Sequence, residues 1–448
     1  MGLSLALEEQ GVPTAPVHTH VFARLAKATS LAGGRPTMRN CFVPQPVVGA
    51  SPEQLRGYIE GTDPLSKLPF MQGVIDALTA PLSDEDLKGA TFVRSNPRLL
   101  DPDTEDNLRE LFGRSRWTDF LPIILPTEDR VERMLKGTRQ PPDRIVGRLR
   151  PTAFREAWEF DVEKVAVNAV MAGARPEHLP VILAMASSGI TARSSSTTSF
   201  SAITVVNGPI RQELGMNDGI GAMGPYNDAN AVIGRAYSLL SQNLQGGSTP
   251  GETYMGSLGN WLGYTACFPE AEERSPWAPF HVDQGFKPTD STVSIFFGGW
   301  YTESGYGPRE TWKAKFIRCL TALEQFLPPL IVMDPLVARG FDELGFSKEK
   351  LINWCAENAR LRAGDYWDDM AIQTLIRPHA VAGVEPFASR LKADPDEMIT
   401  IFRPEDIHIV VTGGETQAAF KMFGGRYAIG GRGTDNRMKP TILIDDWR

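Results

Sequence analysis

Short runs of apolar residues, rich in β-branched side chains, recur along the chain and end in turns of glycine, proline or aspartate. The clearest runs are residues 121–126, 202–206, 294–297, 330–333 and 407–411. Apolar and polar positions do not alternate within them, which is typical of strands buried on both faces. Segments with helical spacing follow several of the turns, including 336–345 and 416–425. This strand–turn–helix order predicts an α/β fold with a largely parallel or mixed sheet.

The order of these elements divides the chain into four predicted parts. Residues 1–45, rich in proline, glycine and threonine, are expected to form an arm that wraps another surface. Residues 46–120 are expected to form a helical zone, in which Ser51 caps the first helix. Residues 121–300 are predicted to form an α/β core with a glycine- and asparagine-rich binding loop, and residues 301–448 a C-terminal α/β part.

That glycine-rich segment has the spacing of a dinucleotide-binding loop but lacks its context. Gly219, Gly221 and Gly224 match the pattern G-x-G-x-x-G. In a nicotinamide or flavin enzyme the first glycine lies in the turn directly after a strand, and a helix begins within the motif. Here the preceding predicted strand ends at residue 206, and the next helix is expected to begin only near Asn227. The context favours another kind of loop, and a nicotinamide or flavin oxidoreductase remains an alternative.

Residues 207–230, between that strand and the helix, are predicted to form a ligand-binding loop. Long ordered loops are uncommon unless they are functional, and exposed backbone N–H groups beside a helix start attract anions. A carboxylate, a phosphate or an oxyanion is the expected ligand group. The candidate binding residues of this loop are Asn207, Asn217, Gly219, Gly221, Gly224, Asn227 and Asn230. The alternative is a plain connector, in which glycine and asparagine only meet the demands of backbone conformation.

A second candidate segment, residues 267–281, concentrates reactive side chains on a loop whose three prolines exclude a regular helix. Its candidates for catalysis are Cys267, Glu272, Glu273 and His281. His281 or a glutamate is expected to act as general base. Cys267 becomes a nucleophile only if a nearby base or cation produces the thiolate. The alternative is a surface loop with solvated carboxylates and an inert buried thiol.

Arg175 is the third candidate for substrate binding. It lies between Gly173, which is expected to end a helix, and Pro176. An arginine fixed in such a turn can offer a bidentate guanidinium to a carboxylate or phosphate. The alternative is an ion pair with Glu177 or Glu163.

Composition and charge narrow the class of partner. Apolar residues make up 42% of the chain and charged residues 22%, the balance of a folded protein. Acidic residues outnumber basic ones, 54 to 46, and no basic block occurs, so neither nucleic acid nor an anionic membrane is an expected partner. The N-terminus lacks the features of a signal peptide, and no segment has the length of a membrane span.

Cysteine and histidine positions give no metal site. The four cysteines lie far apart, which is typical of a reduced cytoplasmic protein. His18 and His20 form a pair in the predicted arm, but no second pair with suitable acids follows. The sequence therefore predicts no metal and identifies no cofactor.

Several longer strings resemble a known bacterial family. They are VEKVAVNAVMAGARPEHLPV, VVNGPIRQELGMN, GPYNDANAVIGRA and EERSPWAPFHVDQGF, within residues 125–286, with a weaker match at IVVTGG. These strings resemble the UGSC-type proteins, which carry selenocysteine or cysteine followed by Gly-Ser-Cys. The resemblance does not extend to the predicted arm or helical zone.

The resemblance implies an α/β protein related to the thiol or selenol subunits of amino-acid reductases, and hence carbon–heteroatom bond chemistry. This chain lacks the motif, and Ala174 stands where some relatives carry cysteine. Any redox thiol would therefore come from a separate partner protein.

Together these features predict a cytoplasmic enzyme, with a homo-oligomer as one expected assembly. It would cleave a carbon–heteroatom bond, by hydrolysis or elimination, in a small anionic or amide-bearing metabolite. The alternative from another class is a non-catalytic subunit that binds substrate or partner for a thiol- or selenol-dependent reductase.

Overall fold

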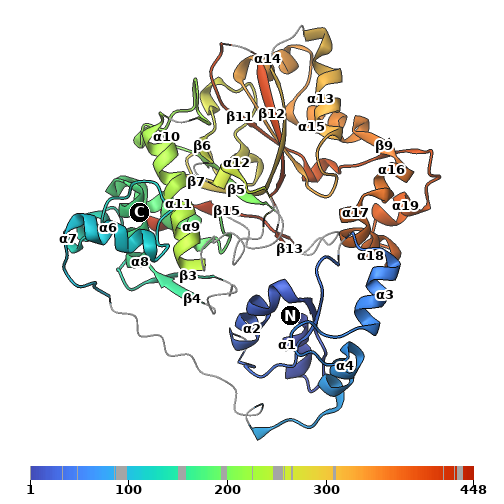
Figure 1. Cartoon of the computed structure of the whole chain (residues 1–448). Coiled ribbons are helices and arrows are strands. Elements are labelled where there is room, and N and C mark those ends of the chain that lie inside the picture. Colours follow the sequence, from blue (N-terminus) through green and yellow to red (C-terminus); the bar gives the residue numbers. More distant parts are fainter. Residues whose placement is uncertain are drawn as a thin grey trace. The chain divides into compact units, whose positions relative to one another are not determined.

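The chain divides into two compact units in a computed structural model (Figure 1). The N-terminal unit comprises Met1–Thr118, Arg148–Glu159 and Gln242–Met255, and the sheet unit comprises Asp119–Gly147, Phe160–Ser241 and Gly256–Arg448. The described residues are 2–32, 34–47, 49–84, 86, 98–149, 158–192, 199–224, 226–245, 256, 258–263, 266–305, 309–416, 418–427, 429–430 and 437–448.

The N-terminal unit contains a strand–helix–strand arrangement where the sequence predicted an arm. Its elements are α1 (Gly2–Glu9), β1 (Val17–Thr19), η1 (His20–Phe22), α2 (Ala23–Ala32), β2 (Cys41–Val43), α3 (Pro52–Glu60), α4 (Phe70–Thr79) and α6 (Glu105–Arg114). β1 and β2 pair in parallel, and α2 lies between them in the chain. Ser51 caps α3 as predicted, since its hydroxyl accepts a hydrogen bond from the backbone N–H of Gln54.

The sheet unit is built on a mixed sheet, which confirms the α/β prediction in its mixed form. The seven strands of this sheet within the described residues are β5 (Ser201–Asn207), β6 (Cys267–Pro269), β7 (Thr292–Gly305), β8 (Pro329–Met333), β11 (His408–Val411), β12 (Ala419–Arg426) and β15 (Thr441–Leu443). Their order is β11-β8-β12-β7-β5-β6, with β15 also paired to β7. β5 with β6 and β8 with β11 are parallel, whereas β7 pairs antiparallel with β5, β12 and β15.

Three predicted elements differ from the structure. Residues 121–126 form no strand, because two prolines interrupt the run. The segment predicted as a helix after residue 414 is strand β12, which pairs with β7 and β8. The pair Gly298-Gly299 lies inside β7 and does not end it. A Cβ atom at Gly298 would lie 1.8 Å from the carbonyl oxygen of Gly424, so glycine allows the two strands to approach.

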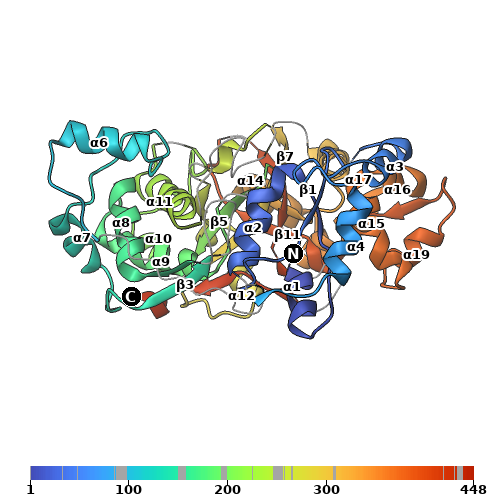
Figure 2. The same ribbon diagram turned by 60° about the horizontal axis from the view of Figure 1, so that its bottom comes forward.

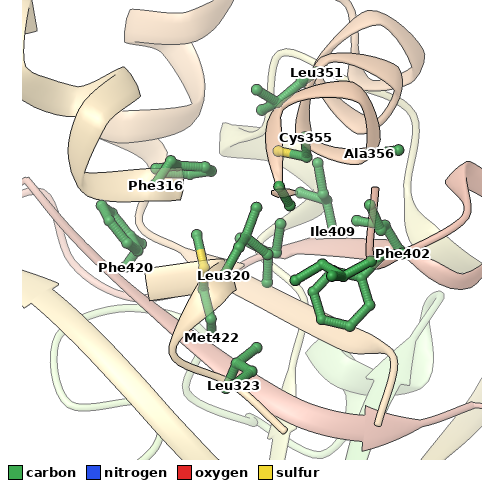
Figure 3. Packing of buried hydrophobic residues seen from close by; sticks show 14 of the residues in the cluster. Phe316, Leu320, Leu323, Leu351, Cys355, Ala356, Phe402, Ile409, Phe420 and Met422 are labelled. Carbon is green, nitrogen blue, oxygen red and sulfur yellow. The ribbon is translucent and has the colours of Figure 1, made fainter. Parts of the chain in front are cut away.

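Both faces of the central strands are buried, as the apolar runs predicted. On β8, Ile331 and Met333 belong to one hydrophobic cluster, and Leu330 and Val332 belong to another. Figure 3 shows the first cluster, where side chains of α13 and α15 pack on Ile409 of β11 and on Phe420 and Met422 of β12. Successive side chains of a strand point to opposite faces, so β8, β11 and β12 each supply both clusters.

Helices cover the sheet unit. They are α7 (Glu128–Leu135), α8 (Val162–Ala172), α9 (Leu179–Ser187), α10 (Ile210–Glu213), α11 (Asp228–Gln245), α12 (Phe280–Asp283), α13 (Trp312–Thr321), α14 (Pro335–Glu343), α15 (Lys348–Asn358), α16 (Ala363–Asp368), α17 (Met370–Leu375), α18 (Arg377–Val381) and α19 (Phe387–Lys392). Figure 2 shows α8, α9 and α11 side by side. α8 ends at Gly173, whose positive φ of 88° is the left-handed conformation that the sequence predicted there.

The remaining elements are short. They are β3 (Ile145–Leu149), β4 (Trp158–Asp161), β9 (Arg360–Arg362), β10 (Met398–Thr400), β13 (Ile429–Gly430), β14 (Arg437–Met438), η2 (Pro176–His178), η3 (Trp261–Gly263), η4 (Glu272–Arg274), η5 (Arg309–Thr311), η6 (Pro404–Asp406) and η7 (Asp445–Trp447). Within the described residues, no helix has both the length and the apolar character needed to cross a lipid bilayer.

Candidate functional site

The two outer strands of the sheet meet at their carboxyl ends. The backbone N–H of Ala271, after β6, donates to the carbonyl of Val411 in β11 at 2.7 Å. The hydroxyl of Thr412 donates to the carbonyl of Pro269 at 2.8 Å. The N–H of Glu270 bonds to the carbonyl of Val206, one residue before β5 ends. These contacts bring the segment after β6 beside the last residue of β5.

A group of polar side chains, here called the polar cluster, lies at this junction. Its members are Asn207, Glu270, Glu272, His281 and Thr292. The amide nitrogen of Asn207 donates to Glu270 Oε2 at 2.6 Å and to Glu272 Oε1 at 3.0 Å. Nδ1 of His281 lies 3.9 Å from the same oxygen of Glu272. Thr292 is the register partner of Asn207 across the β5–β7 pair, so their side chains lie on the same face.

Four members of the polar cluster are fully buried and keep polar atoms without a partner. Asn207, Glu270, His281 and Thr292 each have 0% relative exposure. Among the described residues, no hydrogen bond of normal geometry reaches Asn207 Oδ1, Glu270 Oε1, Thr292 Oγ1 or the imidazole nitrogens of His281, although the backbone carbonyls of Lys287 and Pro288 lie close enough to His281 to favour its charged form. Nearly all buried polar groups in folded proteins are paired, with other protein groups, with ordered water or with a ligand, so this concentration of unpaired ones is unusual.

Burial changes the proton affinity of the two titratable groups in opposite directions. It raises the pKa of Glu270, against the charge of Lys348 and the hydrogen bonds from Phe280 and Asn207. It lowers the pKa of His281, against the charge of Glu272. The glutamate therefore holds a proton more readily than usual, and the imidazole stays neutral over a wider pH range.

Phe280 links the polar cluster to a group of aromatic rings. The backbone N–H of Phe280 donates to Glu270 Oε2 at 2.7 Å. The ring of Phe280 contacts Phe296, His408 and Tyr427, with centroid separations of 5.3–5.6 Å. Phe280 thus joins Glu270, through its backbone, to this group of rings.

Gly208 and Arg211 hold Glu272 and the backbone of Glu270 in place. The N–H of Gly208 donates to Glu272 Oε1 at 2.7 Å, and Arg211 lies 3.0 Å from the same oxygen. Arg211 also donates to the backbone carbonyls of Gly208 and Glu270. Its side chain is 4% exposed and pairs with Glu273 at 2.8 Å. Arg211 was not among the residues predicted from the sequence, although it follows the Asn-Gly turn after a buried strand.

Arg274 ties the start of the predicted binding loop to the ends of the strands. It donates to the carbonyl of Asp218 at 2.6 Å, to a carboxylate oxygen of Asp218 at 2.9 Å, and to the carbonyl of Gly413 at 2.9 Å. Asp218 also lies 3.5 Å from Arg211. The loop therefore approaches the polar cluster at Asp218.

The asparagines of the loop bond to the loop itself. The side chain of Asn217 bonds to the carbonyl of Ile220, to Asn227 and to the N–H of Gly219. The side chain of Asn227 also bonds to the carbonyls of Gly221 and Gly224. The side chain of Asn230 bonds to the N–H and carbonyl of Asn217 and to the carbonyl of Ala222. The N–H of Gly224 bonds to the carbonyl of Gly221. Since the N–H groups of Gly219 and Gly224 already have partners, these two do not form the predicted anion site.

The glycine motif also lacks the geometry of a dinucleotide-binding loop. β5 ends at Asn207, α10 intervenes, and α11 begins only at Asp228. No helix therefore starts within the motif to face a pyrophosphate.

Arg175 lies at the other end of the loop. Its Nε donates to Glu177 Oε1 at 2.7 Å, and its guanidinium pairs with Asp228 at the start of α11. The ion pair with Glu177, which the sequence offered as the alternative to substrate binding, is thus present. None of the described hydrogen bonds or ion pairs of Arg175 reaches the polar cluster.

Two of the other predicted catalytic residues differ in exposure. Burial in β6 raises the pKa of Cys267 to about 12, which opposes formation of a thiolate. The side chain of Glu273 is 55% exposed and bonds to Arg211. Across the described ranges, no group of three or more histidine, cysteine, aspartate or glutamate side chains is arranged to hold a metal ion.

Comparison with known proteins identifies a family for the start of the chain. The model of the UGSC family matches residues 3–62. This match supports the UGSC-type assignment, but it lies in the part of the chain that the resemblance over residues 125–286 did not cover. No curated protein and no solved structure matches the chain.

Proposed function

We propose that this chain is a cytoplasmic enzyme that cleaves a carbon–heteroatom bond in a small metabolite by general acid–base catalysis at the polar cluster. One observation carries the proposal. Glu270 is fully buried, its Oε1 has no partner among the described residues, and burial raises its pKa. A buried carboxyl group with a raised pKa holds a proton that it can give to a bound group.

In this proposal Glu270 and His281 exchange protons with the substrate. Glu270 donates a proton to the departing heteroatom, as hydrolysis and elimination both require. Neutral His281 accepts a proton from an attacking water or from the carbon next to the broken bond. Glu272, held by the N–H of Gly208 and by Asn207, stabilises the imidazolium that forms.

The charges near the polar cluster favour an amide-bearing substrate over an anionic one. Glu272, Glu273 and Asp218 surround Arg211, and their carboxylates already occupy its guanidinium. A substrate carboxylate would have to displace one of them. A neutral amide has no such cost, and its nitrogen is a leaving group that needs a proton.

The proposal is tested with the purified full-length chain and a panel of small primary amides and amino compounds, with ammonia release as the readout. Glu270→Gln keeps the size and hydrogen bonding of the side chain but cannot give up a proton. We expect turnover to fall about 10²–10⁴-fold. Glu349→Gln, an exposed glutamate in the first turn of α15, is the matched control and should retain turnover. Equal turnover in Glu270→Gln and the unsubstituted chain would contradict the proposal.

The family match favours one further candidate, a subunit that presents substrate to a partner protein with a reactive thiol or selenol. Under that proposal the lone chain binds substrate without turning it over, and turnover begins when the partner is added. Activity of the chain alone would exclude it.

A further inference from the structure

We propose that the polar cluster binds a nitrogen group that donates several hydrogen bonds, either the ammonium of a primary amine or the NH₂ of a primary amide. This inference rests on the proposed function and specifies which part of the substrate faces Glu270.

The orientation of Asn207 fixes the polarity of one contact. Its Nδ2 donates to Glu270 Oε2 at 2.6 Å and to Glu272 Oε1 at 3.0 Å. Both are carboxylate oxygens, so the end of the amide that faces them is the nitrogen. The end without a partner is therefore the carbonyl oxygen, which only accepts hydrogen bonds.

Glu270 and Thr292 supply two more acceptors. Glu270 Oε2 is occupied by Asn207 and by the N–H of Phe280, which leaves Oε1. Oε1 accepts hydrogen bonds whenever the carboxyl is ionised, and the hydroxyl oxygen of Thr292 can accept as well. The ammonium of a primary amine brings three donors on one atom, one for each of these oxygens, whereas the NH₂ of a primary amide brings two donors and satisfies two of them.

The local charge points to the same class of ligand. Three carboxylates lie in or beside the polar cluster, those of Asp218, Glu272 and Glu273, together with the carboxyl of Glu270, against the guanidinium groups of Arg211 and Arg274. The guanidinium groups are also bonded to backbone carbonyls. The nearby ammonium of Lys348 pairs with Asp283 at 2.6 Å. The remaining excess is negative, which attracts positive N–H donors and repels anions.

The two sources of the nitrogen group differ in their effect on protons. An ammonium beside Glu270 favours its charged form, so binding releases a proton from the protonated carboxyl. A neutral amide leaves the carboxyl protonated. Calorimetry in buffers of different ionisation enthalpy separates the two, because only proton release makes the measured heat depend on the buffer.

The experiment measures the thermal midpoint of the full-length chain with four probes. Methylammonium and acetamide carry N–H donors, tetramethylammonium has the charge without the donors, and acetate is an anion. At about tenfold excess over Kd, we expect methylammonium or acetamide to raise the midpoint by about 1–2 °C. Tetramethylammonium and acetate should leave it unchanged.

Two variants assign the effect to the polar cluster. Thr292→Val preserves shape and removes an acceptor that has no partner among the described residues, so the fold should tolerate it while probe affinity falls several-fold. Thr204→Val changes a buried threonine of β5 whose hydroxyl bonds to the carbonyl of Ala266, and should leave probe affinity unchanged. Asn207→Leu should abolish the shift where the variant folds.

Three results would overturn the inference: no shift with either donor probe, a larger shift with acetate, or equal shifts with methylammonium and tetramethylammonium. Unchanged probe affinity in Thr292→Val would do the same. Its failure is distinguishable from failure of the proposed function. Turnover that depends on Glu270 without donor binding leaves the function standing, whereas donor binding without turnover overturns the function alone.

Discussion

Two polar regions of the sheet unit, the loop 217–230 and the polar cluster, use asparagine in opposite ways. In the loop, the side chains of Asn217, Asn227 and Asn230 bond to one another and to the loop backbone. In the polar cluster, Asn207 bonds two carboxylates and leaves its carbonyl oxygen without a partner among the described residues. A region whose polar groups satisfy one another maintains its own shape, whereas one that leaves them unsatisfied is suited to bind another molecule.

The largest expected effect is on the support of the polar cluster. Arg211→Ala removes a guanidinium that is 4% exposed and leaves Glu272, Glu273 and Asp218 without their shared cation. Removing one partner of a buried ion pair lowers the unfolding free energy by about 3–5 kcal/mol. Urea unfolding should show a loss of this size. A loss below about 1 kcal/mol would mean that the polar cluster does not depend on Arg211.

A smaller loss of stability is expected in the loop 217–230, whose polar groups bond to one another. Asn230→Ala removes the hydrogen bonds of a side chain in a residue that is 2% exposed, and leaves the N–H and carbonyl of Asn217 unpaired. The cost should be about 2–3 kcal/mol in unfolding free energy. The Michaelis constant should change little, because the loop side chain contacts no ligand. A large change in that constant with unchanged stability would reverse the comparison.

Glu270 predicts a pH dependence whose sign follows from its environment. Burial raises its pKa in the folded state above the value of about 4.3 expected for the unfolded chain. Between these two values the folded state binds more protons, so this group makes the protein less stable as pH rises. Glu270→Gln lacks the titration, and its stability relative to the unsubstituted protein should increase from about pH 4 upward.

The measurement is the unfolding free energy of both proteins at several pH values. The slope of their difference is the readout, since the substitution can also shift the difference by a constant. A flat difference would show that Glu270 is not protonated more readily than a solvated glutamate.

Sequence patterns predicted the elements of the fold better than the contacts between them. α8 ends before Gly173, as its glycine predicted, and α11 begins at Asp228, beside the start predicted near Asn227. Strand β12 was missed, because its pairing with β7 and β8 outweighs the local strand–turn–helix rhythm.

The candidate site divides in the same way. The sequence selected Asn207, Glu272, His281 and Arg175 as candidates. The first three lie together in the structure, whereas Arg175 pairs with Glu177 and Asp228. The sequence did not separate Asn207 from the other asparagines, nor did it identify Arg211. Whether a polar group is satisfied depends on partners distant in the chain, such as Glu270 for Asn207, so composition and spacing do not reveal it.

The smallest expected effect concerns Arg175, which tests the boundary between the two regions. Its side chain is 46% exposed and pairs with Glu177 and Asp228, which are also exposed. Pairs of this kind contribute about 0–1 kcal/mol, so Arg175→Ala should unfold nearly as the unsubstituted protein does. Turnover should also be retained, because the ion pairs of Arg175 end at the start of α11 and do not reach the polar cluster. If turnover were lost while stability stayed the same, the substrate would contact the far end of the loop, and the unpaired atoms near Glu270 would then need another explanation.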